Sequence, residues 1–392
     1  MIMDEKIYFE FLQVATGNRT KMSVSLSDSD WKCLFAFCKR QALIGVGFTA
    51  VERLYKEGVE CPMVLKMQWL ALTLKIEKQN EKLNRQCIEI VRQYENDGIQ
   101  CCILKGQSNL FYYPKMLGKR RQSGDIDLWA KNVEYDAGHE HKSIIKYVKS
   151  QHGLAGNHYR YHISYHHINA PNYNGTSIEV HFRPTHLYPP YRNWILQKWF
   201  KEHTDECMNN RTHMGFSIPT SSVNVVFQMI HMYKHYIGEG IGMRHLMDYY
   251  YTLKVWYNDI MECGGLQSKG MCNNDLSNAI ISKEEIMHIL KSFGMAQFSA
   301  AIMYVLNVVF SMPATYYLCE PNEKEGRNVL DEIMHGGNFG QYAKERPDVY
   351  KHRFKYHIWR LQRLFKLFIS YPEEVLWEPV FRGYLLIWRT VH

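Results

Sequence analysis

The spacing of hydrophobic residues divides the chain into three parts. From Ser27 to Gly98, apolar residues recur every three or four positions, which predicts amphipathic helices, most clearly from Met67 to Tyr94. Helical spacing resumes after Pro189-Pro190 and continues to the last residue. Within this last part we expect breaks near Gly238, Gly264-Gly265, Pro313 and Gly336-Gly337.

The central part has a different pattern. Ile99 to Leu104 is a short, continuous apolar run, which is typical of a buried strand. Asp125 to Ala130 alternates polar with apolar residues and predicts a second strand. Between them we expect a short helix over Ser108 to Tyr113, closed by Pro114, and then a basic loop that contains Lys115, Lys119, Arg120 and Arg121.

Beyond the second strand, we expect a helix and a hairpin. Val133 to Gln151 has helical spacing and ends before Gly153. Two alternating segments, Tyr161 to Asn169 and Thr176 to Phe182, flank Pro-Asn-Tyr-Asn-Gly and predict a β-hairpin. The predicted fold class is α+β, with a small mixed sheet and its helices between an N-terminal helical region and a larger C-terminal one. The predicted boundaries are 1–98, 99–190 and 191–392.

Composition adds limits to this outline. A hydrophobic content of 46% suffices for a core, and a net charge of +8 favours an anionic partner. Basic residues concentrate near the C-terminus, where they indicate either the polar face of an amphipathic helix or a nucleic-acid patch. They are Lys351, His352, Arg353, Lys355, Arg360, Arg363 and Lys366.

Cysteine usage and hydropathy indicate a cytoplasmic protein. The ten cysteines form no Cys-x-x-Cys pair, so we expect reduced core thiols. The start, Met-Ile-Met-Asp-Glu-Lys, carries acids where a signal peptide has a basic and then an apolar segment. The most apolar stretch, Phe298 to Met312, is shorter than the ~20 residues of a membrane span. We therefore expect no membrane partner.

The strongest chemical feature is the pair Asp125 and Asp127 in Ser-Gly-Asp-Ile-Asp-Leu-Trp. Residues two apart on a strand point to the same face, so the two carboxylates would lie together. A hard cation such as Mg²⁺ would relieve their repulsion. The alternative is two solvated acids on an edge strand, since Asp-x-Asp is common by chance.

Two further elements strengthen the metal interpretation. Leu-Lys-Gly-Gln-Ser, from Leu104 to Ser108, follows a predicted strand and opens a predicted helix, a geometry that binds anions but that also occurs as an ordinary turn. In the hairpin, Glu179 and His181 share one face. If their strand lies beside that of Asp125, Glu179 becomes a third carboxylate for a two-metal site.

These segments together resemble the DNA polymerase β-like nucleotidyltransferase superfamily. They are Lys105-Gly106-Gln107-Ser108, the run from Arg121 to Leu128, and Ile178-Glu179-Val180-His181. Within the superfamily, the chain looks most like the bacterial "uncharacterised nucleotidyltransferase" family, and more distantly like the nucleotidyltransferase toxins of abortive-infection systems. The resemblance is specific over about Ile99 to Arg183.

The resemblance implies a metal-dependent enzyme that transfers an NMP from a nucleoside triphosphate, such as ATP, to a hydroxyl acceptor. Asp125, Asp127 and Glu179 would be catalytic metal ligands for Mg²⁺ or Mn²⁺, and Gly106 with Ser108 would hold the triphosphate. Lys105 and Arg121 are candidates to neutralise the triphosphate, and Arg244 is a candidate to face the nucleotide cleft. Gln107 departs from the family's usual Gly-Gly or Gly-Ser turn and could keep phosphate from the backbone.

Other interpretations remain open. The chain could be an inactive binding or regulatory module of the same fold, or it could bind nucleic acid with its basic C-terminal helices. Arg244 and Asp248 are one helical turn apart and could simply pair. His231 and His235 have zinc-ligand spacing, but no cysteine stands at ligand spacing beside them. The acceptor, whether a small molecule, a protein or an RNA, is not indicated by the sequence.

Overall fold

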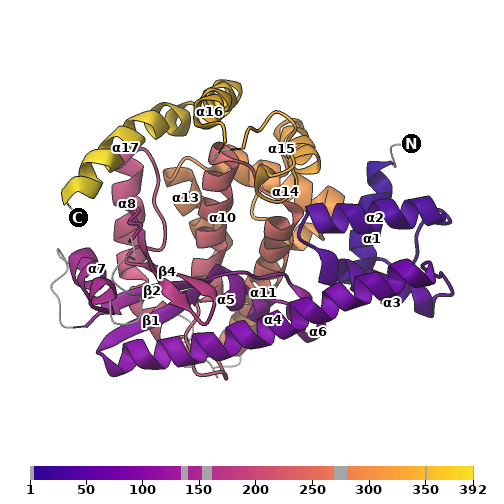
Figure 1. The fold of residues 1–392 in the computed structure, drawn as a ribbon, viewed down its shortest axis with the longest axis horizontal. Coiled ribbons are helices and arrows are strands. Elements are labelled where there is room, and N and C mark those ends of the chain that lie inside the picture. Colours follow the sequence, from indigo (N-terminus) through magenta and orange to yellow (C-terminus); the bar gives the residue numbers. More distant parts are fainter. Residues whose placement is uncertain (1–3, 134–139, 152–160, 269–279, 349–350, 392) are drawn as a thin grey trace.

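A computed structural model describes residues 4–133, 140–151, 161–268, 280–348 and 351–391. It confirms the α+β class, with a four-stranded mixed sheet between helical regions (Figure 1). The N-terminal helices are α1 (Glu5–Thr16), α2 (Asp28–Arg40), α3 (Ile44–Lys56) and α4 (Met63–Asn96). Helix α4 runs from this group to the sheet along one side of the molecule (Figure 1).

The sheet has the order β1-β2-β4-β3. Its strands are β1 (Ile99–Leu104), β2 (Ile126–Asn132), β3 (His167–Tyr173) and β4 (Thr176–His181). The helices of this region are α5 (Lys105–Asn109), the 3₁₀ turn η1 (Leu110–Tyr112), α6 (Lys115–Arg120) and α7 (Glu140–Ser150). Strands β2 and β4 run parallel, whereas the two outer pairs are antiparallel.

The remaining chain is helical apart from short connections. Its first helices are α8 (Pro190–Glu202), α9 (Thr204–Asn209), α10 (Ser221–Gly238), α11 (Met243–Ser268), α13 (Lys283–Ser292) and α14 (Ala296–Phe310). They are followed by η3 (Ala314–Tyr316), α15 (Glu323–Gly336), η4 (Asn338–Gly340), α16 (Arg353–Leu367) and α17 (Pro372–Val391). Helices α16 and α17 cross the side of the molecule opposite α4 (Figure 1).

Local sequence signals explain several boundaries. Helix α2 begins at a capping box in which Ser27 and Asp30 satisfy each other's backbone N–H groups. Asn174 and Gly175 form the two-residue turn between β3 and β4, with φ of 48° and 78°. Positive φ at both positions matches the twist of the flanking strands, and Asn-Gly tolerates it. One hydrophobic core joins residues from the N-terminal helices, the sheet and the C-terminal helices.

Four predicted elements need correction. The expected basic loop is helix α6, in which Arg120 pairs with Glu52 and Glu77 instead of facing solvent. Strand β3 begins at His167 and runs through the Pro-Asn-Tyr that was assigned to the turn. The expected break at Gly264-Gly265 is absent, because α11 continues to Ser268. The helix expected from Val133 is described only from Glu140, and its expected end at Gly153 lies outside the described residues.

Two further expectations can be compared with the structure. The cysteines within the described segments are all free thiols, as predicted. Among the described helices, none combines the length and apolarity that a bilayer crossing requires.

Candidate active site

A cavity of about 450 Å³ lies between the sheet and the helices that follow it. Its sheet side is lined by Lys105, Asp125, Asp127, His167 and Glu179. Its other wall comes from α10, α11, the segment around η4, and α16 and α17. The cavity therefore joins residues that are more than two hundred positions apart in the chain.

The register of the sheet brings the three predicted acids together. In the parallel pair of β2 and β4, Asp127 lies directly beside Glu179, and Asp125 immediately precedes β2. Asp127 is buried, Glu179 is half-buried, and Asp125 is exposed at the cavity. The strand of Glu179 thus lies beside the strand that Asp125 precedes, as a site with three carboxylates requires.

Asp127 is held by two cationic or proton-donating groups. Its Oδ1 accepts hydrogen bonds from Lys105 Nζ at 2.6 Å and from His181 Nε2 at 3.0 Å. Burial raises the pKa of Asp127, but the charges and hydrogen bonds of Lys105 and His181 outweigh burial and hold that pKa well below its ordinary value. Asp127 is therefore ionised at neutral pH.

The pKa values of Asp125 and Glu179 are also shifted by their close neighbours. The negative charge of Asp127 is the main influence on Asp125 and raises the pKa of Asp125. Burial raises the pKa of Glu179, whereas the hydrogen bond from His181 lowers it, and the net shift is downward. Three acids that are this close need a cation among them, and Lys105 supplies one positive charge. Oxygen ligands of this kind fit a hard divalent ion.

The turn after β1 differs in detail from the phosphate turn that was predicted. Gly106 lines the cavity, but Ser108 is fully buried and is not among the described residues that line it. Gln107 points away, because its Nε2 donates to Asn84 Oδ1 at 2.6 Å on α4. The residue with the unusual backbone is Lys105, at φ 49°, a conformation that non-glycine residues seldom adopt and that recurs at functional sites.

Arg121 has a partner that the sequence did not predict. Its Nε and Nη2 donate to the two oxygens of Asp248, each at 2.6 Å, and both side chains are buried. Asp248 therefore pairs with Arg121, and the described residues show no Arg244–Asp248 ion pair, which was the alternative to an Arg244 that faces the cleft. Arg121 lines the cavity as part of this fixed pair, which links the end of α6 to α11.

Arg244 and Lys234 are the cations of the opposite wall. Arg244 donates to the Gln122 carbonyl at 2.9 Å, and its Nε has no hydrogen-bond partner among the described residues. Burial and the nearby Arg121 lower the pKa of Arg244 to about 10. Lys234, on α10, is 2.8 Å from His186 Nδ1, and burial lowers its pKa to about 7. Among the described residues, neither side chain forms an ion pair with a carboxylate, and both line the cavity that contains the three acids.

Sequence reasoning missed most of this second wall. Lys234, Tyr188 and Phe339 line the cavity, and Phe339 lies just after Gly336-Gly337, where only a break between helices was expected. Histidines 166, 167 and 181 gather beside the acids. Of these, His181 has a sequence signal because it shares a strand face with Glu179, whereas His166 and His167 were not predicted. His231, which was weighed as a zinc ligand with His235, also lines the cavity.

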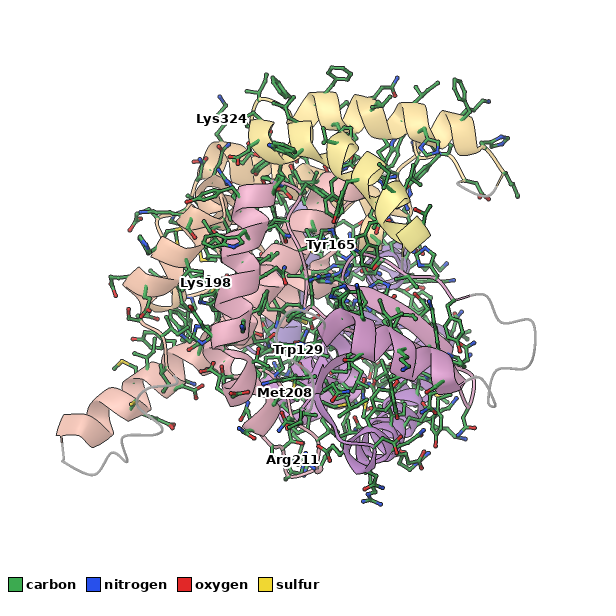
Figure 2. The ribbon with its side chains drawn as sticks, turned by 90° about the vertical axis from the view of Figure 1, so that its left-hand side faces the viewer. Trp129, Tyr165, Lys198, Met208, Arg211 and Lys324 are labelled. Carbon is green, nitrogen blue, oxygen red and sulfur yellow. The ribbon has the colours of Figure 1, made fainter. Side chains whose placement is uncertain are left out.

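The basic C-terminal segment is largely engaged in the fold. Arg360 pairs with Glu378, and Arg363 Nη2 pairs with Glu332 Oε1 at 2.6 Å. Exposed aromatic residues, Phe354 and Phe365, share the outer face of α16 with Lys355 and Lys366. Figure 2 shows α16 and α17 as the outermost layer, with Tyr165 beneath α17.

The α+β fold with its small mixed sheet agrees with the class expected from the sequence. The family described as uncharacterised nucleotidyltransferases matches residues 27–266, and the chain belongs to this family. The matched segment runs from the start of α2 into α11, so it includes both walls of the cavity up to Arg244 and Asp248. No curated protein and no solved structure is significantly similar to the chain.

Proposed function

We propose that the protein transfers an NMP from a nucleoside triphosphate to a hydroxyl acceptor in this cavity. The observation that carries the proposal is the pairing of Asp127 with Glu179 across β2 and β4, with Asp125 at the same cavity. Carboxylates in this arrangement can hold two divalent ions that clamp the attacking and leaving oxygens of an in-line displacement.

Asp125, Asp127 and Glu179 fit Mg²⁺ or Mn²⁺ as ligands. Their oxygen donors suit a hard ion, and the raised pKa of Asp125 beside Asp127 records a repulsion that a divalent cation would relieve. When bound, the metal would neutralise and orient the triphosphate. Lys105, already in contact with Asp127, would contribute one further positive charge on the sheet side.

The opposite wall would hold the rest of the nucleotide. Arg244 and Lys234 are the cations that we propose for the phosphates, together with backbone N–H groups near Gly106. Arg121 would act by fixing α11 through Asp248, and we propose no direct phosphate contact for Ser108. Phe339 and Tyr356 supply flat surfaces on which a base can stack.

In the proposed reaction, the acceptor hydroxyl oxygen bonds to the α-phosphorus as the bond between that phosphorus and the pyrophosphate oxygen breaks. Pyrophosphate leaves with the bonding electrons. The hydroxyl proton passes to a carboxylate, Asp127 or Glu179, which lies at the reacting centre. Gln107 does not oppose this reaction, since its side chain is directed at α4.

Labelled nucleotides test the proposal. The protein is incubated with each nucleoside triphosphate, labelled either at the α- or at the γ-phosphate, together with cell extract and Mg²⁺ or Mn²⁺. We expect α-label, and no γ-label, to enter an acceptor, with release of pyrophosphate. Transfer of γ-label would indicate a kinase, and absence of any transfer by folded protein with all four bases would contradict the proposal.

A further inference from the structure

Three histidines form a cluster beside the acids. His166 and His167 stand at the start of β3, and His181 ends β4, where it lies opposite His167 in the antiparallel pair. Ring centroids are 4.5 Å apart for His166 and His167, and 5.1 Å apart for His167 and His181. The hairpin register, set by the Asn174-Gly175 turn, therefore holds the rings together.

The ring nitrogens have distances suited to metal ligands. One nitrogen from each of the three rings lies within 4.8 Å of the others. His167 Nδ1 and His166 Nε2 are 3.2 Å apart. Two nitrogens that ligate one tetrahedral ion at about 2.05 Å stand about 3.3 Å apart, so this pair already has the required separation. The other nitrogen pairs lie within 4.8 Å of one another, so binding of one ion requires these rings to move closer together.

A carboxylate lies next to this cluster. Glu179 Oε2 is 3.7 Å from His167 Nδ1 and 3.6 Å from His181 Nε2. Three imidazoles and one carboxylate make a four-donor set for a tetrahedral ion of borderline softness. Such a set differs from the all-oxygen ligands that Mg²⁺ prefers.

We propose that His166, His167 and His181, with Glu179 as a fourth donor shared with the acidic site, form a nitrogen-rich site for an ion of the Zn²⁺ class beside that acidic site. The proposal goes beyond nucleotide transfer, because the histidines can hold such an ion whether or not the neighbouring acids are catalytic. An ion in this site would fix the Glu179 carboxylate beside Asp127. The nitrogen-rich site would thereby position one ligand of the proposed magnesium site.

The surroundings preorganise the histidines. Ser164 Oγ lies 3.2 Å from His166 Nδ1, the ring nitrogen that does not face His167, so it can orient that ring. The ring of Tyr165 packs against Phe381 and Trp388 of α17, which anchors the segment that carries both histidines (Figure 2). His181 is fully buried, its Nε2 donates to Asp127 Oδ1, and its Nδ1 has no hydrogen-bond partner among the described residues, so Nδ1 is the nitrogen left to bind an ion. Neighbours that fix ligand orientation are typical of protein metal sites.

Cobalt spectroscopy of the full chain tests this site. Metal-free protein is titrated with Co²⁺, and we expect visible absorption of a tetrahedral ion, without the near-ultraviolet band of thiolate ligands, that disappears when Zn²⁺ is added. The variants His166→Gln and His167→Gln should each lower Co²⁺ affinity by at least about tenfold. His231→Gln is the control. His231 lines the same cavity, but among the described residues it does not lie with two other donor side chains close enough to bind one ion.

The outcomes separate this proposal from the proposed function. Binding of a nucleoside triphosphate with Mg²⁺ is measured on the same samples, and its failure alone would contradict nucleotide transfer. Wild-type protein that gives no tetrahedral Co²⁺ spectrum would overturn the histidine site, even if the glutamine variants were unstable. Equal Co²⁺ affinity of folded wild-type, His166→Gln and His167→Gln proteins would overturn it as well.

Discussion

Asp127 shows how much of the site is fixed by single residues. Its spacing from Asp125 and the pattern around Glu179 predicted a shared face, and the structure brings all three to one cavity. The contacts of Asp127 with Lys105 and His181 were not predictable, since they depend on the strand order of the sheet and on the unusual backbone of Lys105. The sequence therefore indicated the acids correctly but not their counter-charges.

The buried pair of Arg121 with Asp248 gives a stability prediction. Replacing Arg121 by Met leaves the buried Asp248 carboxylate without its positively charged partner and with the hydrogen bond from Tyr113 Oη still in place, which costs about 3–5 kcal/mol. Urea denaturation measures the loss. Arg211→Met is the control, because Arg211 pairs with Glu95 at the surface and its removal should cost about 0–1 kcal/mol. Equal, small effects of the two changes would contradict the buried role of Arg121.

Lys234 gives a prediction about pH. Burial lowers its pKa to about 7 from an ordinary 10.5, so between these pH values the unfolded chain binds a proton that the folded chain does not. The contribution of Lys234 to stability therefore rises with pH across this window. Lys234→Met removes the penalty, and we expect it to raise Tm by about 2–4 °C near pH 7 and to have little effect near pH 10.5.

The charged neighbours of Lys234 define the control for this change. It faces His186, with Glu374 and Lys105 farther away, and Glu374 itself has a pKa raised to about 7 by burial. Lys198→Met replaces an exposed lysine of α8 and should leave Tm nearly unchanged at both pH values. A lower Tm for Lys234→Met than for wild type near pH 7 would show that burial does not disfavour this charge.

At the scale of elements, the spacing of hydrophobic residues predicted whether a segment is a helix or a strand better than it predicted where the segment begins and ends. The strand Ile99–Leu104 and the long helix α4 were found where the pattern placed them, because each has one uninterrupted period. The basic stretch near Arg120 was misinterpreted as a loop, since its partners Glu52 and Glu77 are distant in sequence. Strand β3 accepts Pro171 because it is an edge strand of the sheet, where a missing N–H is tolerated.

The β3–β4 turn is the element on which the position of Glu179 depends. Gly175 has φ of 78°, so Gly175→Ala forces a side chain into the left-handed region and should cost about 1 kcal/mol. Space is not the cause, because the nearest atom to an added Cβ is Lys82 Nζ at 3.9 Å. Urea denaturation measures the cost, and Gly124→Ala, at an open position without positive φ, should be close to neutral. Equal stability of both variants and wild type would contradict the turn geometry.

At the scale of the whole molecule, the cavity is a product of long-range packing. Lys234, Phe339 and Tyr356 come from three separate parts of the C-terminal region and meet the sheet at one cavity. Nothing in their local sequence indicates this meeting, because helical periodicity specifies which face is buried and not which cavity it borders. The sequence thus predicted the acidic wall, and the structure was needed for the cationic one.

The most direct test of the account is calorimetric titration of the protein with nucleoside triphosphates in the presence of Mg²⁺ or Mn²⁺. We expect metal-dependent binding of at least one of the four common triphosphates to the wild type. The double change Asp125→Asn and Asp127→Asn should abolish that binding while circular dichroism shows a folded chain. Absence of binding by folded wild-type protein for all four bases, or undiminished binding by the folded double variant, would contradict the claim that these acids form a metal–nucleotide site.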